Sequence, residues 1–343
     1  MPKSICVFLY SAYKQTDTNT PLQPQGAFLR AIADSGIPIL RAYLILEIGL
    51  FSRSNSIKAK QQISFGERLG VYMSSYVERI AKASTVGVID ADLLTKGTRH
   101  PNLALMKISG YCKANNKSVE LLYQDDAYDR IGDFDLVFLS RVFTFSEVPD
   151  NLDSYKNLLK GGTGFYENGG EGLPDEIEHH MPDYSLYAEY VDFSINIKGR
   201  PRSWFADYLD YSIGFLTRGC FRKCSFCVNQ KYDRCRPHSP LREFVDASLP
   251  YVYLWDDNFF ACSEWETLFD DLEKMGKPFQ FRQGLDIRLL TKQKAIRLSR
   301  AKYRGDMIFA FDHIEDRDLI VKKLKLWRRY SAKGTRLYVL CAY

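Results

Sequence analysis

Apolar residues after about position 85 fall into short runs separated by helical patterns. The runs VGVID, VELLY and DLVFLS have the length and the β-branched character of buried strands. Between the first two runs, residues 100–115 place apolar side chains at helical spacing. Strand, helix, strand and strand in this order predict a parallel α/β sheet within residues 86–200.

The same alternation continues through residues 203–343. Strand-like runs are expected at 211–216, 251–255, 278–281, 307–311 and 337–340, and helices at 264–275, 291–301 and 318–331. This βα repeat predicts a barrel-like or open parallel sheet, in which residues after the carboxyl end of each strand lie on one face. Those residues are Cys220, Cys224, Cys227, Asp256, Asp257, Asn258, Arg282, Gln283, Asp312 and His313.

Residues 1–85 hold less regular patterns. A strand is expected at 5–10 and a helix within 65–83, with a polar link at 14–25 and an amphipathic run at 26–35 between them. The most apolar stretch, 37–51, is interrupted by Pro38, Arg41 and Glu47. It therefore predicts a buried strand or helix instead of a membrane span, which needs about 20 apolar residues. No chemistry is recognisable in this N-terminal segment, and its role stays unassigned.

The composition is that of a globular protein with sizeable cores, since 45% of the 343 residues are apolar and 26% are charged. The formal net charge of +5 permits an anionic partner without requiring one. Eight cysteines in a chain of this length do not resemble a secreted disulfide framework, and the N-terminus shows no signal peptide. We expect a protein of the reducing cytoplasm with no membrane partner, in which clustered cysteines are metal ligands.

Three cysteines, Cys220, Cys224 and Cys227, form the pattern C-x3-C-x2-C on a short loop directly after the run at 211–216. Thiolates favour iron–sulfur clusters and zinc. A disulfide needs two sulfurs and a structural zinc usually takes four ligands, so three thiolates leave a tetrahedral or cubane site one ligand short. The pattern predicts a metal centre with an open coordination position.

This motif, with Phe226 in the aromatic position before the last cysteine, resembles that of the radical S-adenosylmethionine (radical SAM) superfamily. The resemblance implies that the three cysteines hold three irons of a [4Fe–4S] cluster and that the fourth iron binds SAM. It also implies that one electron, from a donor such as flavodoxin or ferredoxin, cleaves SAM to a 5'-deoxyadenosyl radical that abstracts hydrogen from a substrate. The class of substrate is not indicated.

The segment after the second strand of this region fits the same resemblance. Asp256, Asp257 and Asn258 occupy the place where the family contacts the amino group of SAM, and they supply acceptors for an ammonium. The glycines that the family has there are absent from this sequence. A solvated turn is the alternative interpretation.

The segment FRQGLDIRLL is similar to one in the cobalamin-linked branch of the family, which makes Gln283 and Arg288 candidate cofactor contacts. Arg288 is expected either to clamp a carboxylate or to pair with Asp286. Residues 86–200 resemble the cobalamin-binding-type Rossmann domain of that branch. The corrinoid signature D-x-H-x-x-G is absent, so cobalamin binding is not expected, although the glycine-rich turn at 159–165 leaves room for a cofactor.

The expected fold is therefore α/β: a Rossmann-like (cobalamin-binding-type) domain at 86–200 followed by a partial (β/α) radical SAM barrel at 203–343. The family's partial barrel normally has six strands. Because only five strand-like runs follow residue 203, the barrel is expected to be truncated after strand five.

Two alternatives stay open at the level of the sequence. Cys224, Cys227, Cys235 and His238 read as C-x2-C-x7-C-x2-H, four ligands suited to a non-catalytic zinc or iron–sulfur scaffold. An RNA-modifying, methylthiolation-type enzyme of the superfamily would need a second cluster, and the remaining cysteines have no tight spacing. Basic residues around the motif either raise the potential of an anionic cluster or, with interleaved aromatics, line a nucleic-acid groove. They are Arg218, Arg222, Lys223, Lys231, Arg234 and Arg236.

Overall fold

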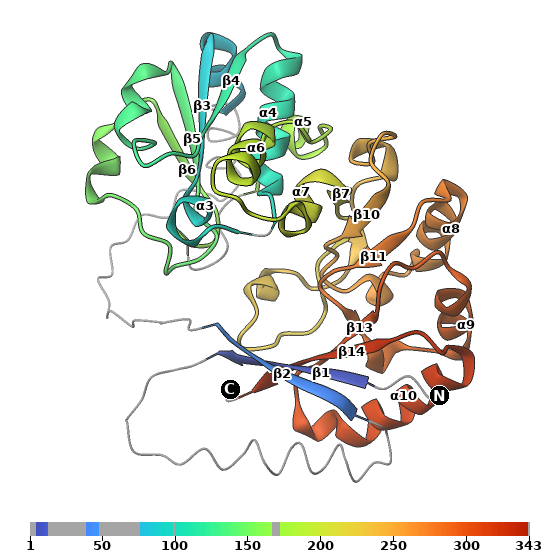
Figure 1. Cartoon of the computed structure of the whole chain (residues 1–343). Helices are drawn as coiled ribbons and strands as arrows, with labels where there is room; N and C mark the ends of the chain where they lie inside the picture. Colours follow the sequence, from blue (N-terminus) through green and yellow to red (C-terminus); the bar gives the residue numbers. More distant parts are fainter. Residues whose placement is uncertain (1–4, 13–38, 48–75, 99, 167–171, 342–343) are drawn as a thin grey trace, which may run out of the picture. The chain divides into compact units, whose positions relative to one another are not determined.

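Figure 1 shows the computed structural model of the protein, which describes residues 5–12, 39–47, 76–98, 100–166 and 172–341. The chain divides into two compact units. Unit 1 takes residues 1–51, 213–241 and 250–343, and unit 2 takes residues 52–212 and 242–249. Both units are α/β structures with parallel sheets, as the alternating patterns predict. None of the helices within the described ranges combines the length and the apolar character that crossing a membrane requires.

Unit 2 is built on a parallel sheet of four strands in the order β4-β3-β5-β6. The strands are β3 (Thr85–Asp90), β4 (Ser118–Leu122), β5 (Leu136–Ser140) and β6 (Leu158–Gly161). Val86 and Val88 of β3 belong to one apolar core, and Ile89 belongs to another. Both faces of the sheet are therefore covered, which explains why its strands read as continuous apolar runs.

The helix that the pattern at residues 100–115 predicts is present in unit 2, whereas most other helices of this unit were not predicted. In α4 (Leu103–Ala114), the side chain of Asn102 caps the first turn by accepting a hydrogen bond from Leu105 N at 3.2 Å. The other helices are α3 (Ala91–Lys96), α5 (Asp175–Glu178), α6 (Ala188–Asn196) and α7 (Ala206–Leu209). Short 3-10 helices are η1 (Asp129–Asp133), η2 (Asp150–Ser154), η3 (Arg202–Phe205) and η5 (Leu241–Glu243).

Unit 1 contains two sheets and a small hairpin. Strands β7 (Tyr211–Gly214), β10 (Tyr251–Leu254) and β11 (Phe279–Phe281) form one sheet in the order β11-β10-β7. The second sheet has the order β12-β13-β14-β1-β2, and its strand pairs are parallel. Its strands are β12 (Leu285–Asp286), β13 (Met307–Phe311), β14 (Thr335–Cys341), β1 (Ile5–Ala12) and β2 (Ile39–Glu47).

Three amphipathic helices of unit 1 match the sequence patterns to within about one residue at each end. They are α8 (Trp265–Met275), α9 (Lys292–Arg300) and α10 (Arg317–Tyr330). Gly276 ends α8 in the left-handed conformation with φ of 73°, which glycine adopts without steric cost. The buried Trp327 fixes α10 to β14 by donating a hydrogen bond from Nε1 to Thr335 Oγ1 at 3.0 Å.

The N-terminal segment joins the sheet of unit 1. β1 pairs in parallel with β14, from Ile5 opposite Thr335 to Ser11 opposite Cys341. β2 pairs with the other side of β1 and lies within the apolar stretch 37–51. The sequence indicated no neighbour for the run at 337–340, whereas the structure continues the sheet there with two strands from earlier in the chain. The polar link at 14–25, the amphipathic run at 26–35 and residues 65–75 lie outside the described residues.

Candidate functional site

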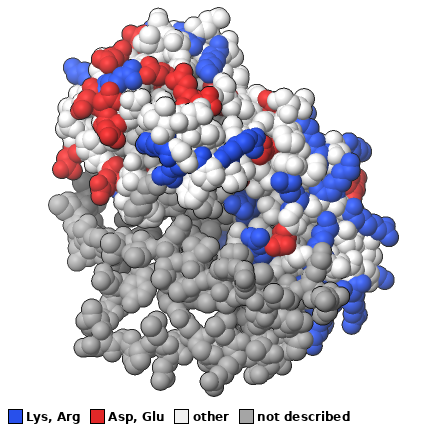
Figure 2. Space-filling view, viewed as in Figure 1, with Lys and Arg blue, Asp and Glu red and all other residues white. Residues whose placement is uncertain are grey.

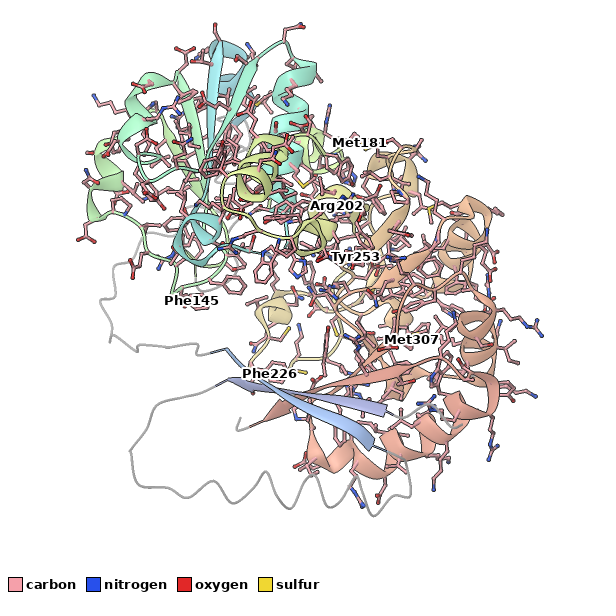
Figure 3. All side chains as sticks on the ribbon, in the orientation of Figure 1. Phe145, Met181, Arg202, Phe226, Tyr253 and Met307 are labelled. Atoms are coloured by element: carbon pink, nitrogen blue, oxygen red, sulfur yellow. The ribbon has the colours of Figure 1, made fainter. Side chains whose placement is uncertain are left out.

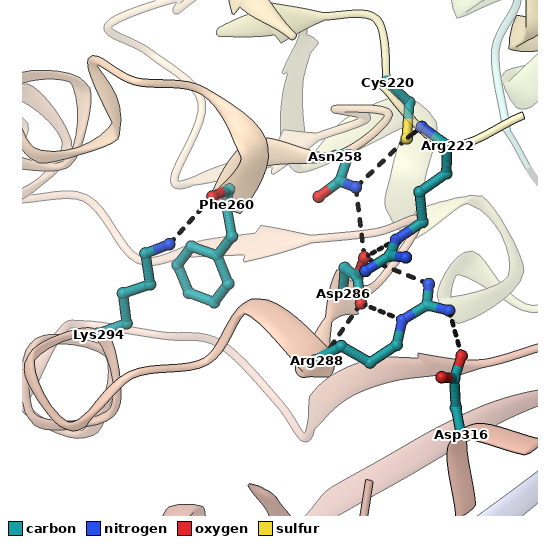
Figure 4. Close-up of polar contacts among 8 residues, drawn as sticks. All are labelled: Cys220, Arg222, Asn258, Phe260, Asp286, Arg288, Lys294 and Asp316. Atoms are coloured by element: carbon teal, nitrogen blue, oxygen red, sulfur yellow. Dashed lines mark hydrogen bonds and ion pairs between the residues drawn. The ribbon is translucent and has the colours of Figure 1, made fainter. Parts of the chain in front are cut away.

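Loops at the carboxyl ends of several unit 1 strands are joined by hydrogen bonds (Figure 4). Asn258, which follows β10, donates from Nδ2 to Cys220 Sγ at 3.3 Å. Arg222, on the cysteine loop after β7, donates from Nε to Asp286 Oδ2 at 2.5 Å, and Asp286 ends β12. The predicted gathering of Cys220 and Asn258 on one face is therefore observed, and Asp286, which was not part of that prediction, joins them from the end of β12.

The cysteine loop, residues 219–234, is closed by a two-stranded hairpin of β8 (Thr217–Arg218) and β9 (Arg236–Pro237). Gly219 starts the loop with φ of 94°, and a Cβ atom there would lie 2.4 Å from the carbonyl oxygen of Arg234. Only glycine fits this conformation and this close approach. Inside the loop, Lys223 Nζ donates to the carbonyl oxygens of Gln230 at 2.7 Å and Tyr232 at 2.5 Å.

The three cysteines of the loop are free thiols and partly buried. Cys220 Sγ accepts hydrogen bonds from Arg222 N at 3.4 Å and from Asn258 Nδ2 at 3.3 Å. Cys227 Sγ accepts from Asn229 N at 3.4 Å, at the start of η4 (Val228–Lys231). Burial raises the pKa of the Cys224 and Cys227 thiols. Thiols with aligned N–H donors are the donor set that iron–sulfur clusters use.

Asp256 and Asp257 hold the backbone that leads into the loop. Asp256 is buried and accepts from Thr217 Oγ1 at 2.6 Å and Thr217 N at 2.7 Å; its burial raises its pKa to about 7. Asp257 accepts from Gly219 N at 2.7 Å and from Asn229 Nδ2 at 2.8 Å. Both carboxylates thus act on the loop itself, a role that the sequence did not indicate.

Asn258 keeps one acceptor free. Its side chain is 4% exposed, and its amide nitrogen faces Cys220 and Asp286. Its Oδ1 is buried and has no hydrogen-bond partner within the part of the chain that the structure describes. A buried polar atom without a partner costs about 1–3 kcal/mol, so this oxygen indicates a place where a ligand donor fits.

Arg288 pairs with Asp286, which is one of the two alternatives that the sequence leaves open. Its Nε donates to Asp286 Oδ1 at 2.7 Å, and its Nη1 donates to Asp316 Oδ2 at 2.6 Å. Burial acts to lower the pKa of Arg288, but hydrogen bonds from its two carboxylate partners outweigh it and raise the pKa. The second candidate of the same segment, Gln283, is exposed on the turn between β11 and β12.

Phe226 lies on the cysteine loop, as labelled in Figure 3, with its ring centroid 6.2 Å from that of His313. His313 follows β13 and Asp312; partial burial raises the pKa of the Asp312 carboxyl. The electrostatic influence of Asp312 reaches Cys224 and Cys227. The end of β13 therefore belongs to the same neighbourhood as the cysteines.

Cys235 and His238, which the alternative zinc site would need, contact protein groups other than Cys224 and Cys227 in the described contacts. Cys235 is buried beside Thr217 and Cys262, and burial raises its pKa to about 12. His238 has its Nδ1 2.9 Å from Ser239 Oγ. Among the residues that the structure describes, no three His, Cys, Asp or Glu side chains stand in a ready metal-holding arrangement. This applies to the three loop cysteines and to the zinc set alike.

Two glycines of the glycine-rich turn of unit 2 lie in close contact with Arg141, whereas Gly161 meets nothing within 4 Å. Gly162 has φ of 102°, and a Cβ atom there would lie 2.3 Å from the carbonyl oxygen of Arg141. A Cβ on Gly164 would lie 2.7 Å from Arg141 Cγ. These two glycines therefore let the turn after β6 pack against the loop after β5, which the sequence did not reveal.

Charge is divided unevenly between the two units. Unit 1 carries an excess of Lys and Arg, whereas unit 2 carries an excess of Asp and Glu. Lys and Arg side chains gather on the surface over α8 and α9 (Figure 2). A positive field around unit 1 stabilises an anionic centre bound there.

A scan against models of known protein families finds no match for this chain, and searches of curated proteins and of solved structures find none either.

Proposed function

We propose that unit 1 is a radical SAM enzyme in which Cys220, Cys224 and Cys227 bind a [4Fe–4S] cluster. The observation that carries this proposal is the pair of N–H donors on the sulfur of Cys220, one of which comes from the buried Asn258. Hydrogen bonds of this kind stabilise a ligating thiolate and raise the reduction potential of the cluster.

The cofactor contacts follow from the same residues. A bound cluster with SAM at its open iron supplies the reductive cleavage of SAM to a 5'-deoxyadenosyl radical. Asn258 offers its free Oδ1 as an acceptor for the ammonium group of SAM. Asp256 and Asp257 hold the loop from which the cysteines project, and Phe226 covers it on the side of His313.

Reduction requires an electron donor such as flavodoxin or ferredoxin, which we propose as the partner of unit 1. The basic residues of the loop would offset the negative charge of a reduced cluster held by the three cysteines. Arg222 is held within this region by Asp286, and Arg218 lies 3.6 Å from Asp257.

The test is anaerobic reconstitution of the full chain, followed by desalting, iron and zinc analysis, and EPR with and without SAM. We expect about 4 irons per chain and an EPR signal of the reduced cluster that changes when SAM is added. Cys224→Ala should lose both iron and 5'-deoxyadenosine production. Cys235→Ala is the matched control and should keep both, because Cys235 contacts Thr217 and Cys262.

Two results would contradict the proposal. Stoichiometric zinc without iron in the anaerobic protein, lost in Cys235→Ala, would support the zinc scaffold instead. Retention of iron and of SAM cleavage in Cys224→Ala would remove the cluster from the cysteine loop altogether.

A further inference from the structure

The carboxylate of Asp286 is linked by hydrogen bonds to residues that surround Cys220 (Figure 4). Its Oδ2 accepts hydrogen bonds from Arg222 Nε at 2.5 Å and from Asn258 Nδ2 at 3.5 Å. Its Oδ1 accepts from the backbone N of Arg288 at 3.2 Å and from Nε of the same residue at 2.7 Å. One buried carboxylate thus connects the loop after β7, the segment after β10 and η7 (Ile287–Leu289).

The two partners that Asp286 takes from the other segments are also the two donors to the sulfur of Cys220. Arg222 donates from its backbone N at 3.4 Å, and Asn258 donates from Nδ2 at 3.3 Å. Asp286 itself is bound to the side chains of these donors. Their placement around Cys220 therefore depends on a residue that follows in sequence after both of them.

Asp286 is fixed in its charged form and in its orientation. Burial acts to raise the pKa of Asp286, but hydrogen bonds from Arg288 and Arg222 outweigh burial and hold the pKa below its usual range. The far end of the Arg288 guanidinium also contacts Asp316, which does not touch Asp286 in the described contacts. A carboxylate held between two guanidinium groups has little freedom to rotate, so the position of Arg222 is defined by the strand end and not by the loop alone.

We propose that Asp286 is a positioning residue for the metal centre: it holds Arg222 and Asn258 so that both donate to Cys220, and thereby sets iron affinity and reduction potential at that ligand. This inference rests on the proposed function. Loss of a residue that orients a metal ligand costs about 10-fold or more in metal affinity. Loss of N–H donors to a ligating sulfur lowers the reduction potential.

Four variants of the full chain separate this role from others. Asp286→Asn removes the charge at the centre of the network. Arg222→Met removes the tie to the loop and leaves the pair of Asp286 and Arg288 intact, whereas Arg222→Lys restores a cation that reaches the carboxylate. Asp316→Asn is the matched control, because Asp316 binds the same Arg288 but makes no contact with Arg222 or Asn258 in the described contacts.

Three quantities are measured for each variant: iron retained after desalting, the midpoint potential of the cluster, and amide hydrogen exchange of residues 219–229 in the iron-free protein. We expect Asp286→Asn and Arg222→Met to bind iron about 10-fold more weakly, to have a lower midpoint potential and to exchange faster in the loop. Arg222→Lys and Asp316→Asn should resemble the wild type in all three.

The proposal is overturned if Arg222→Met keeps wild-type iron affinity, potential and loop exchange, or if Arg222→Lys fails to restore them. Should Asp286→Asn not fold, the comparison of Arg222→Met with Arg222→Lys decides the question. The exchange measurement needs no metal, so it tests the positioning role even where the wild type binds no iron. A wild-type protein that binds no iron would contradict the proposed function, and the network of Asp286 would then be only structural.

Discussion

Replacing Asp90 by Asn should change how the stability of unit 2 depends on pH. Asp90 ends β3 and is 2% exposed. Its Oδ1 accepts a hydrogen bond from Leu93 N at 3.3 Å, and its Oδ2 accepts from the Tyr187 hydroxyl at 2.8 Å. Burial raises its pKa from 3.8 to about 7. Asparagine has the same shape, serves equally well as a helix cap and carries no charge at any pH.

The sign follows from proton binding. The folded chain keeps a proton on Asp90 over a pH range in which the unfolded chain has released it. The stabilisation from this group is therefore fully present below pH 3.8 and is lost as the pH rises to about 7. At 1.36 kcal/mol for each pH unit, this range corresponds to about 4 kcal/mol in the free energy of unfolding as an upper bound. The Asp90→Asn variant has no carboxyl group at this position to deprotonate, so its free energy of unfolding should rise by up to about 4 kcal/mol relative to that of the wild type between pH 4 and pH 8.

Urea unfolding of the metal-free protein, followed by pulsed hydrogen exchange of peptides from β3 and β5, measures unit 2 by itself. Asp135→Asn is the control of opposite sign. Hydrogen bonds from Thr85 N and Ser84 N hold the pKa of Asp135 below its usual value, so its stabilisation is present at neutral pH and lost as the pH falls. An Asp90→Asn variant whose stability follows the wild type in parallel from pH 4 to pH 8 would refute the reasoning.

Three further outcomes are expected. Gly162→Ala should destabilise unit 2 by about 2 kcal/mol or more in urea unfolding, because Gly162 has a positive φ and a Cβ atom there would meet the carbonyl oxygen of Arg141. The control Gly161→Ala should change the free energy of unfolding by less than about 1 kcal/mol, because a Cβ atom there meets nothing within 4 Å. Thr335→Val should lower the free energy of unfolding of unit 1 by about 1–3 kcal/mol in the same experiment, because it leaves the buried Nε1 of Trp327 without an acceptor. Trp327→Phe should then destabilise the Thr335→Val variant less than it destabilises the wild type. Protein soaked in hydroxocobalamin and desalted should retain no corrinoid spectrum, and stoichiometric retention would make methyl transfer the leading function.

Local patterns predicted the positions of many elements but not which elements pack together. The helices α8, α9 and α10 were expected within about one residue of their ends, because apolar residues at helical spacing face the core of unit 1. The strand at 5–10 was also expected. Its place beside β14 was not, because pairing between strands depends on tertiary contacts and leaves no periodic signal in either strand.

The candidate site shows the same division. The gathering of Cys220 and Asn258 on one face followed from the rule that parallel strands end together. The sequence could not tell which polar groups were already bound to protein. Asp256 supplies its oxygens to Thr217, and Asp286 takes two arginines, through contacts between residues far apart in the chain. Of the three residues that the sequence proposed as acceptors, Asn258 is the one whose buried oxygen has no hydrogen-bond partner among the described residues.

The pairing of β1 with β14 has a consequence for the order in which the protein forms during synthesis. β1 is synthesised long before β14 (Thr335–Cys341), which is its partner in the sheet. Unit 2, whose main part is continuous over residues 52–212, can close its core while the ribosome is still making unit 1. Until β14 arrives, β1 and β2 have unpaired backbone edges that other chains can occupy. Expression yield and aggregation of this protein should therefore depend on translation speed and on chaperones that cover the N-terminal strands.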